Sequence, residues 1–358
     1  MTTRRAFLAG LAAAGATPRL GWAAVGQPAY LAAARRADGG FVLTGIDAQG
    51  RDAFTVPLPA RGHAGAAHPG HAEAVVFARR PGSYALVIDC ASGAVLHRLS
   101  PPKGRQFNGH GAYSADGALL FTSEQVAEGS AGRIGVWDVA AGYLRTGEVS
   151  THGIGPHELR LMPGGDALVV ANGGIDTAPD DRTKLNLHAM SPSLVYLRLD
   201  GSLLEQVALE PGLAQNSIRH LAVSPDGQVA FAMQWEGARG MALPLLGLHR
   251  RGAAPVLASA PLGDELAMQG YAGSVALSGD GTEFVISSPR GGRLHRFGRD
   301  GAFLGAVSRA DVCGLAPHPQ GVLASDGLGG LLLLRGGATE VLAAAPLGWD
   351  NHVVALAG

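Results

Sequence analysis

The stretch HGAYSADGALLFTSE, residues 110–124, decides the fold, because it places two short apolar runs on either side of a Ser-x-Asp-Gly turn. Apolar runs of this length around an Asp-Gly turn are typical of a β-hairpin. Similar hairpins recur along the chain, and the expected first strands begin near His63, His110, His157, His220, Ser274, Val312 and His352. The stretch is therefore one copy of a degenerate repeat with seven members.

The spacing of the copies indicates the architecture. Successive starts are 47, 47, 63, 54, 38 and 40 residues apart, which is close to the forty-odd residues of a four-stranded propeller blade. We therefore predict an all-β protein, a seven-bladed β-propeller. The seventh inner strand ends the chain, so residues 29–35 and 40–47 are expected to close the ring as its partners. A β-sandwich or two smaller β-domains is the alternative.

Composition narrows the function classes. Glycine supplies 54 of 358 residues, charged residues only 16%, and the formal net charge is −1. This balance gives no attraction to nucleic acid or to anionic lipid. Cys90 and Cys313 are too few for a disulfide framework.

The N-terminus contains Arg4 and Arg5, then Ala-Phe-Leu and an alanine-rich apolar run ending near Ala24. This order is that of a twin-arginine export signal. We expect a signal peptide over residues 1–24, a periplasmic mature protein over 25–358 and no membrane span in that mature form, because the apolar run is too short to cross a bilayer.

Residues 173–193 interrupt the repeat as a long insertion after the second strand of the third blade. Insertions of this kind map to loops on one face of a repeat protein, where binding commonly occurs. The 25–358 region is otherwise expected to form a single propeller.

The repeat brings two sets of polar residues to one end of the central channel. The first set begins the inner strands: His63, His110, His157, His220 and His352, with Glu158 and Arg219 beside two of them. The second set ends the second strands: Glu124, Asn172, Gln234, Arg290 and Asp326. The five histidines are consecutive around a closed ring. Histidines in turns and outer strands, such as His249 and His295, are expected at the surface.

The turns limit this prediction. His110 and His220 lie five residues before their turns, but His63 and His157 lie six before theirs. One residue of slip reverses the direction of a strand side chain. Glu158 therefore has the register that faces the channel, unless a bulge at the 163–165 turn restores His157.

Three interpretations of these residues stay open. In the first, the histidines only fill a tapering channel and form its polar end. In the second, iron, copper or haem iron is held by a set of these residues, since imidazole is the commonest protein ligand for such ions; the candidates are His110, His220, Glu158, His157, His63 and His352. In the third, Arg219, Arg290 and Lys184 bind an anion or small molecule that Glu124, Asn172 and Gln234 help to orient. No local catalytic or ligand motif is present.

The stretches GRQFNGHGAYSADGALLFTSE (104–124), GIGPHELRLMPGGDALVVANGGI (153–175), LNLHAMSPSLVYL (185–197), SIRHLAVSPDG (217–227), SPRGG (288–292) and ADVCGLAPH (310–318) carry a resemblance. The chain resembles a family of twin-arginine-exported bacterial proteins known as a domain of unknown function. That family is similar to propellers of the quinoprotein amine dehydrogenase β-chain type. Its members are encoded beside imelysin-like and di-haem iron-uptake proteins, which implies a periplasmic accessory in iron acquisition with those proteins as partners.

The sequence therefore predicts a metal or small polar ligand at a histidine-lined channel mouth, without assigning catalysis. Two rival functions remain. One is a lactonase-like hydrolase in which a metal at the mouth polarises the substrate. The other is a scaffold that presents blade edges and the insertion to a partner protein.

Overall fold

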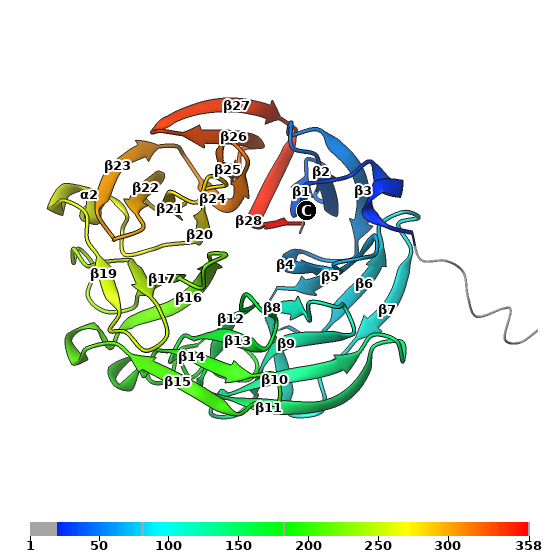
Figure 1. Ribbon diagram of the computed structural model, residues 1–358, viewed down its shortest axis with the longest axis horizontal. Helices are drawn as coiled ribbons and strands as arrows, with labels where there is room; N and C mark the ends of the chain where they lie inside the picture. Colours follow the sequence, from blue (N-terminus) through cyan, green and yellow to red (C-terminus); the bar gives the residue numbers. More distant parts are fainter. Residues whose placement is uncertain (1–19, 80–81, 182, 357–358) are drawn as a thin grey trace, which may run out of the picture.

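The computed structural model describes residues 20–79, 82–181 and 183–356, and the twin-arginine segment expected over residues 1–24 lies outside them up to residue 19. Seven four-stranded antiparallel sheets stand around a central channel (Figure 1). The seven-bladed propeller predicted from the repeat is confirmed. In the described part of the chain, no helix has the length and apolar character needed to cross a membrane.

Each of the first three blades follows the chain from the inner strand outward. Blade one consists of β4 (Gly62–Ala67), β5 (Glu73–Ala78), β6 (Ala85–Asp89) and β7 (Val95–Leu99). Blade two consists of β8 (Arg105–Tyr113), β9 (Leu119–Val126), β10 (Ala131–Asp138) and β11 (Leu144–Ile154). Blade three consists of β12 (Pro156–Leu161), β13 (Ala167–Asn172), β14 (Ser193–Arg198) and β15 (Leu203–Ala208).

The next three blades repeat this order. Blade four consists of β16 (Asn216–Val223), β17 (Val229–Trp235), β18 (Leu246–His249) and β19 (Val256–Ala258). Blade five consists of β20 (Ser274–Leu277), β21 (Glu283–Ser288), β22 (Arg293–Gly298) and β23 (Phe303–Ser308). Blade six consists of β24 (Val312–His318), β25 (Gly321–Asp326), β26 (Gly330–Arg335) and β27 (Ala338–Ala344). The short helical elements are η1 (Trp22–Val25), η2 (Leu187–Ala189), η3 (Pro211–Leu213) and α2 (Leu262–Ala267).

Blade seven closes the ring with strands from both ends of the described chain. β28 (Leu347–Ala355) is its inner strand, followed by β1 (Tyr30–Arg36), β2 (Phe41–Ile46) and β3 (Asp52–Leu58). In Figure 1 the red β28 lies beside the blue β1. This confirms the predicted closure, which leaves the ring without an open edge between its first and last strands.

Apolar side chains alternate along the strands and fill the spaces between neighbouring blades. Phe121 and Ile134 of blade two, for example, pack with Leu159 and Val170 of blade three, all of them buried. Because each sheet is covered on both sides by its neighbours, the second strands are buried along most of their length. This packing fixes the inner strands, and with them the channel residues.

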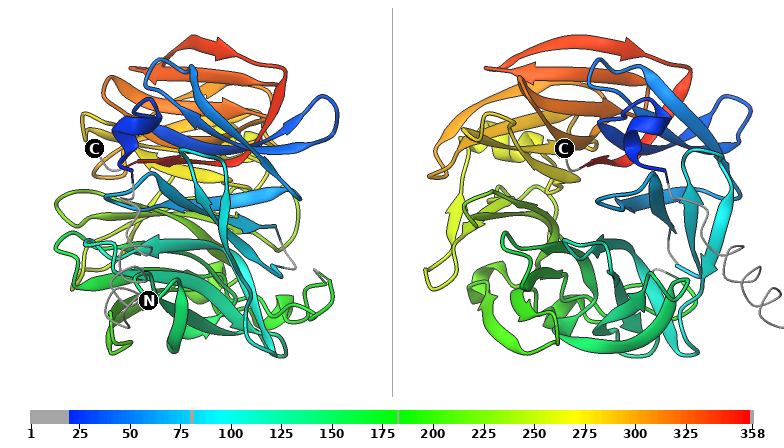
Figure 2. Two further views of the ribbon diagram at one scale, coloured as in Figure 1. Left: turned by 90° about the vertical axis from the view of Figure 1, so that its right-hand side faces the viewer. Right: turned by 45° about the vertical axis from the view of Figure 1, so that its right-hand side comes forward.

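The insertion falls where the repeat predicted it, between β13 and β14. It contains η2 and a single bridge between Thr177 and Lys184. In the side view of Figure 2 it projects from one face of the ring. Lys184 is thereby brought to the same end of the channel as the starts of the inner strands.

Candidate functional site

Five imidazole rings meet in the channel, one from each of five consecutive inner strands. The ring centroid of His110 lies 5.0 Å from that of His63, 4.8 Å from that of His157 and 5.7 Å from that of His220. The centroid of His352 lies 4.8 Å from that of His63 and 4.7 Å from that of His220. We call these five residues the histidine cluster. The strands that carry them belong to blades seven, one, two, three and four.

Irregular strand pairing explains how the two registers noted in the sequence reach one point. Each cluster histidine lies at a register shift of its inner strand, as between Gly62 and Gly65 in β4 and between Pro156 and Leu159 in β12. A bulge inserts an extra residue and re-aims the side chains around it. The bulge that brings His157 into the channel therefore lies at the start of its strand, and not at the 163–165 turn.

Gly109 gives His63 room beside His110. Its backbone has φ +94°, a left-handed conformation that favours glycine, and a Cβ built at this position would overlap the His63 ring. The Asn-Gly-His order in β8 therefore combines a bulge with a close approach of two strands. The glycine is part of the site although it contributes no side chain.

Two histidine triads can each hold a metal ion. In one, ligand atoms of His63, His110 and His157 lie within 4.8 Å of one another; in the other, the same holds for His110, His220 and His352. His110 belongs to both. His63 and His157 of the first triad line the wider cavity at the channel mouth, His110 and His352 of the second line a small cavity of about 20 Å³ beyond it, and His220 lines both. We call the first the outer triad and the second the inner triad.

Burial keeps His110, His157 and His352 of the cluster uncharged at neutral pH. Burial and the neighbouring histidines lower the pKa of His110 and of His157 well below the usual range, and they lower the pKa of His352 to about 3. A neutral imidazole has a lone pair available for a metal. Among the described residues, His110 Nε2, His157 Nδ1 and His352 Nε2 have no hydrogen-bond partner although they are buried.

Glu158 supports the cluster from the side of the small cavity. Its Oε2 lies 3.2 Å from His220 Nδ1 and accepts a hydrogen bond from the Leu221 amide, while its Oε1 pairs with Arg160 at 2.6 Å. Burial raises the pKa of Glu158, but Arg160 and His220 outweigh it and lower the pKa to about 2. The carboxylate therefore orients His220, as the outer partner of a metal-binding histidine commonly does.

Beyond the outer triad, the channel opens into a cavity of about 320 Å³, which we call the mouth cavity. Of the residues predicted from the second-strand ends and their neighbours, Arg219, Gln234, Arg290 and Lys184 line it. Arg219 is 3.6 Å from Glu236, which also pairs with Lys184 of the insertion. Gln234 donates to the Ala272 carbonyl at 3.2 Å, and Arg290 lies over the Tyr271 ring at 4.2 Å.

The structure brings three other predicted residues to different places. Glu124 lies inside blade two, fully buried, and its carboxylate accepts a hydrogen bond from Arg145 of β11 at 2.7 Å. Asn172 ties three strands together by donating to the Thr151 carbonyl and to Ser193 Oγ. Asp326 pairs with Arg309. Second-strand ends have the right height along the channel, but these side chains are held by partners on neighbouring strands and loops.

The structure also adds residues that the sequence reasoning missed. Asn108, Arg79, Tyr271, Glu236 and Asn351 all line the mouth cavity. Asn108 lies two residues before His110, and Asn351 lies directly before His352. This closeness in the sequence could have identified both asparagines as channel residues. Arg79 and Glu236 lie in loops outside the regular strands, where no repeat position marks them. In addition, His249 and His295 are buried, so the expected surface position of these histidines is wrong.

Comparison with solved structures bears only on the fold of this chain. The chain is similar to Kuenenia stuttgartiensis hydrazine synthase, with a TM-score of 0.60 and 14% sequence identity over 89% of this chain and 96% of that one. No curated protein matches the sequence. The family model described as "Protein of unknown function (DUF1513)" matches residues 56–356, which include all seven inner strands, and the chain belongs to this family.

Proposed function

We propose that the protein binds a transition-metal ion at the histidine cluster, with iron(II) as the expected ion. The observation that carries the proposal is the set of three buried ring nitrogens, on His110, His157 and His352, that have no partner among the described residues. Buried polar atoms are nearly always satisfied in folded proteins, so each exception needs an explanation. A metal ion at one triad would be bound by His110 and His157, and an ion at the other triad by His110 and His352.

A purely structural role accounts less well for the same residues. Histidines that only fill a channel would be expected to bond to backbone groups, as His249 does when its Nε2 meets the Ala253 carbonyl at 2.9 Å. The cluster instead packs five imidazole rings against one another and leaves ring nitrogens of His110, His157 and His352 without a partner among the described residues. This arrangement costs free energy unless a cation or a donor shares the space.

His110 is the residue on which both possible ion positions depend, because it belongs to both triads. His63 and His157 would complete the outer position, His220 and His352 the inner one. In either position the protein would supply three imidazoles and leave coordination sites for water or another ligand. Such a set of nitrogen ligands suits iron(II), copper, nickel and zinc.

The expected choice of iron follows from the resemblance to exported proteins found beside iron-uptake proteins. On this proposal the chain is carried to the periplasm by its twin-arginine segment and works as an accessory in iron acquisition, with imelysin-like or di-haem proteins as partners. The charged and amide side chains around the mouth cavity favour a small hydrated or chelated ion over the apolar macrocycle of haem.

The test compares His110→Asn with His188→Ala, a control that removes an exposed histidine of η2 outside the cluster. Anaerobic titration with Fe²⁺, and separately with Zn²⁺, should give one high-affinity site in the wild-type protein and in the control. His110→Asn should weaken it more than about 100-fold, since loss of even an outer partner of a metal ligand costs 10- to 100-fold. Equal affinities in all three proteins, with circular dichroism showing each folded, would reject the site.

A further inference from the structure

Basic side chains concentrate at the mouth cavity, directly next to the outer histidine triad. Arg79, Lys184, Arg219 and Arg290 line it together with His63 and His157, and Glu236 is the one carboxylate among its lining residues. With neutral histidines, four basic groups and one acid leave a formal charge of +3 on the lining. The positive charge of the lining therefore favours binding of an anion.

This charge conflicts with a bare metal cation. The cluster histidines contribute no negative charge, and Glu236 offsets only one of the four basic groups that line the mouth cavity, so an ion bound at the outer triad would face a lining of net positive charge. Like charges a few ångströms apart in a partly desolvated site repel strongly. An anion bound to the ion on its open side would remove the conflict, because it would neutralise the metal and the basic groups together.

Two side chains at the mouth cavity have buried polar atoms without a hydrogen-bond partner among the described residues. Asn108 is 2% exposed, and neither its Oδ1 nor its Nδ2 has a partner among the described residues; the same holds for Nε of Arg219. Both residues line the cavity beside cluster histidines, Asn108 next to His110 in the same bulge and Arg219 next to His220. Amide and guanidinium donors of this kind bind carboxylate oxygens well.

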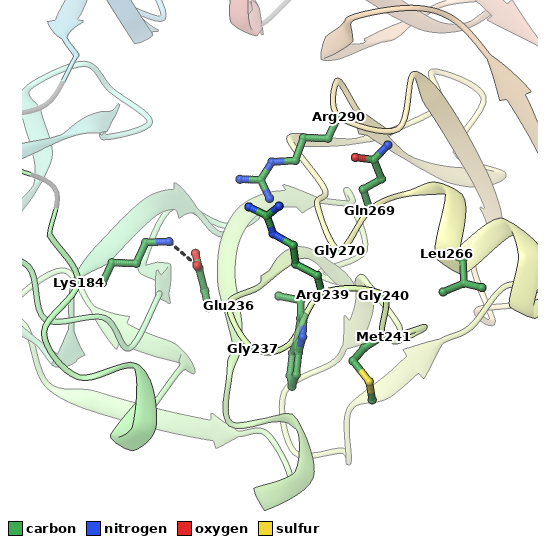
Figure 3. Close-up of a pocket in the computed structure, with 11 residues that line it drawn as sticks. Lys184, Glu236, Gly237, Arg239, Gly240, Met241, Leu266, Gln269, Gly270 and Arg290 are labelled. Atoms are coloured by element: carbon green, nitrogen blue, oxygen red, sulfur yellow. Dashed lines mark hydrogen bonds and ion pairs between the residues drawn. The ribbon is translucent and has the colours of Figure 1, made fainter.

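A second cavity of about 700 Å³ adjoins the first and shares Lys184, Glu236 and Arg290 with it. Arg239 and Gln269 add polar groups to its lining, and Arg239 and Arg290 extend into it from two different loops (Figure 3). The Lys184–Glu236 ion pair lies where the two cavities meet. A ligand with several carboxylates would find basic groups on both sides of this pair.

We propose that the mouth cavity binds a small polycarboxylate, and that the metal is held as a ternary complex between this anion and the histidine cluster. The inference rests on the metal site proposed above and names the form in which the ion is recognised, a polycarboxylate chelate. A volume of about 320 Å³ is at the lower end of the range for small-ligand sites, which fits a compact chelator and excludes a bulky one. Arg219 and Arg290 would bind the carboxylates, and Asn108 would fix their orientation.

Citrate is the probe, because it competes for metal with any protein that does not bind the chelate itself. Metal affinity is measured by equilibrium dialysis with Zn²⁺, with and without equimolar citrate. In the wild-type protein citrate should raise the apparent affinity for Zn²⁺ about tenfold or more. Arg290→Gln and Arg219→Gln should retain binding of Zn²⁺ alone and lose the gain from citrate. The control is Arg250→Gln, which removes an exposed arginine paired with Asp226; it should behave as the wild type.

The outcomes separate the two proposals. Citrate that strips Zn²⁺ equally from the wild type and from Arg290→Gln overturns the chelate while leaving the metal site intact. Failure to bind Zn²⁺ under both conditions overturns the metal site and the chelate with it. Inorganic phosphate at the same concentration is a further arm, and an equal gain with phosphate would overturn the assignment to a polycarboxylate.

Discussion

Five inner strands of the ring carry the histidine cluster, and the two inner strands of blades five and six do not. In blade five, β20 begins at Ser274 and pairs with β21 in continuous register. In blade six, β24 has a register shift like those of the histidine strands, but Cys313 occupies it. The same fold position is thus filled in two ways within one molecule.

The difference teaches that the fold does not require histidine at this position. Ser274 is buried and its Oγ accepts a hydrogen bond from the Leu315 amide at 3.3 Å, so a small residue satisfies the neighbouring strand. Cys313 is buried as a thiol, and burial raises its pKa to about 12. Since serine and cysteine are sufficient in two blades, the propeller does not need the five imidazoles in the others, and this supports the proposed ligand site.

The variant with the largest expected effect removes the space that the histidine strands share. In Gly109→Ala the new Cβ would overlap the His63 ring and force a left-handed backbone on alanine. We expect a loss of about 2 to 4 kcal/mol in the free energy of unfolding. Gly104→Ala is the matched control, because Gly104 also has positive φ but open space around it; it should lose about 1 to 2 kcal/mol in urea denaturation. Equal losses would contradict the role of Gly109.

A second variant tests the support of the cluster and leaves its ligands in place. Glu158→Gln removes the charge that orients His220, so metal affinity should fall 10- to 100-fold, about 1.4 to 2.7 kcal/mol. Glu283→Gln is the counterpart in blade five, since Glu283 is similarly buried and pairs with Arg296 at 2.6 Å. Titration with Zn²⁺ should give wild-type affinity for Glu283→Gln. A similar fall in both variants would mean that any buried carboxylate matters to the same extent.

The smallest expected effect concerns a buried histidine outside the cluster. It compares the pH dependence of stability with and without this histidine. His295 of blade five is packed against Phe297 and Phe303, and burial lowers its pKa to about 4; Asp264 raises this pKa and Arg293 lowers it, each by less than burial does. Its usual pKa near 6.5 applies in the unfolded chain, which therefore binds the proton first as the pH falls. Stability from neutral His295 is complete above pH 6.5 and is lost as the pH falls toward 4, at up to about 1.4 kcal/mol per pH unit.

His295→Phe removes this dependence and leaves that of the cluster histidines. Denaturation curves at pH 7 and pH 5 should show a smaller decrease in the free energy of unfolding for the variant than for the wild type. His97→Phe, a substitution of a partly exposed histidine on β7, serves as the control. An identical pH dependence in wild type and His295→Phe would show that His295 titrates normally in the folded protein.

The repeat was sufficient to predict the propeller and its closure, because turn spacing determines how many blades form and where each inner strand starts. It also placed five histidines at one end of the channel, but it left open which of them face inward. The direction of individual side chains was not predictable to the same extent. Glu124 and Asn172 end their strands at the right height, yet each has an internal partner, Arg145 or Thr151, that no sequence pattern connects to it. Arg79 and Glu236 reach the cavity from loops whose paths depend on packing with neighbouring blades.

His352 lies on the strand that is synthesised after the other six inner strands, and that strand pairs with β1 from the opposite end of the described chain. The inner triad can therefore assemble only after the chain has been synthesised through β28 and this strand has paired with β1. A nascent chain that ends before β28 would contain four of the five rings and lack the closed ring that brings them together. Metal binding at this triad would thus depend on ring closure, and a translation product interrupted before His352 would be unable to compete for the ion there.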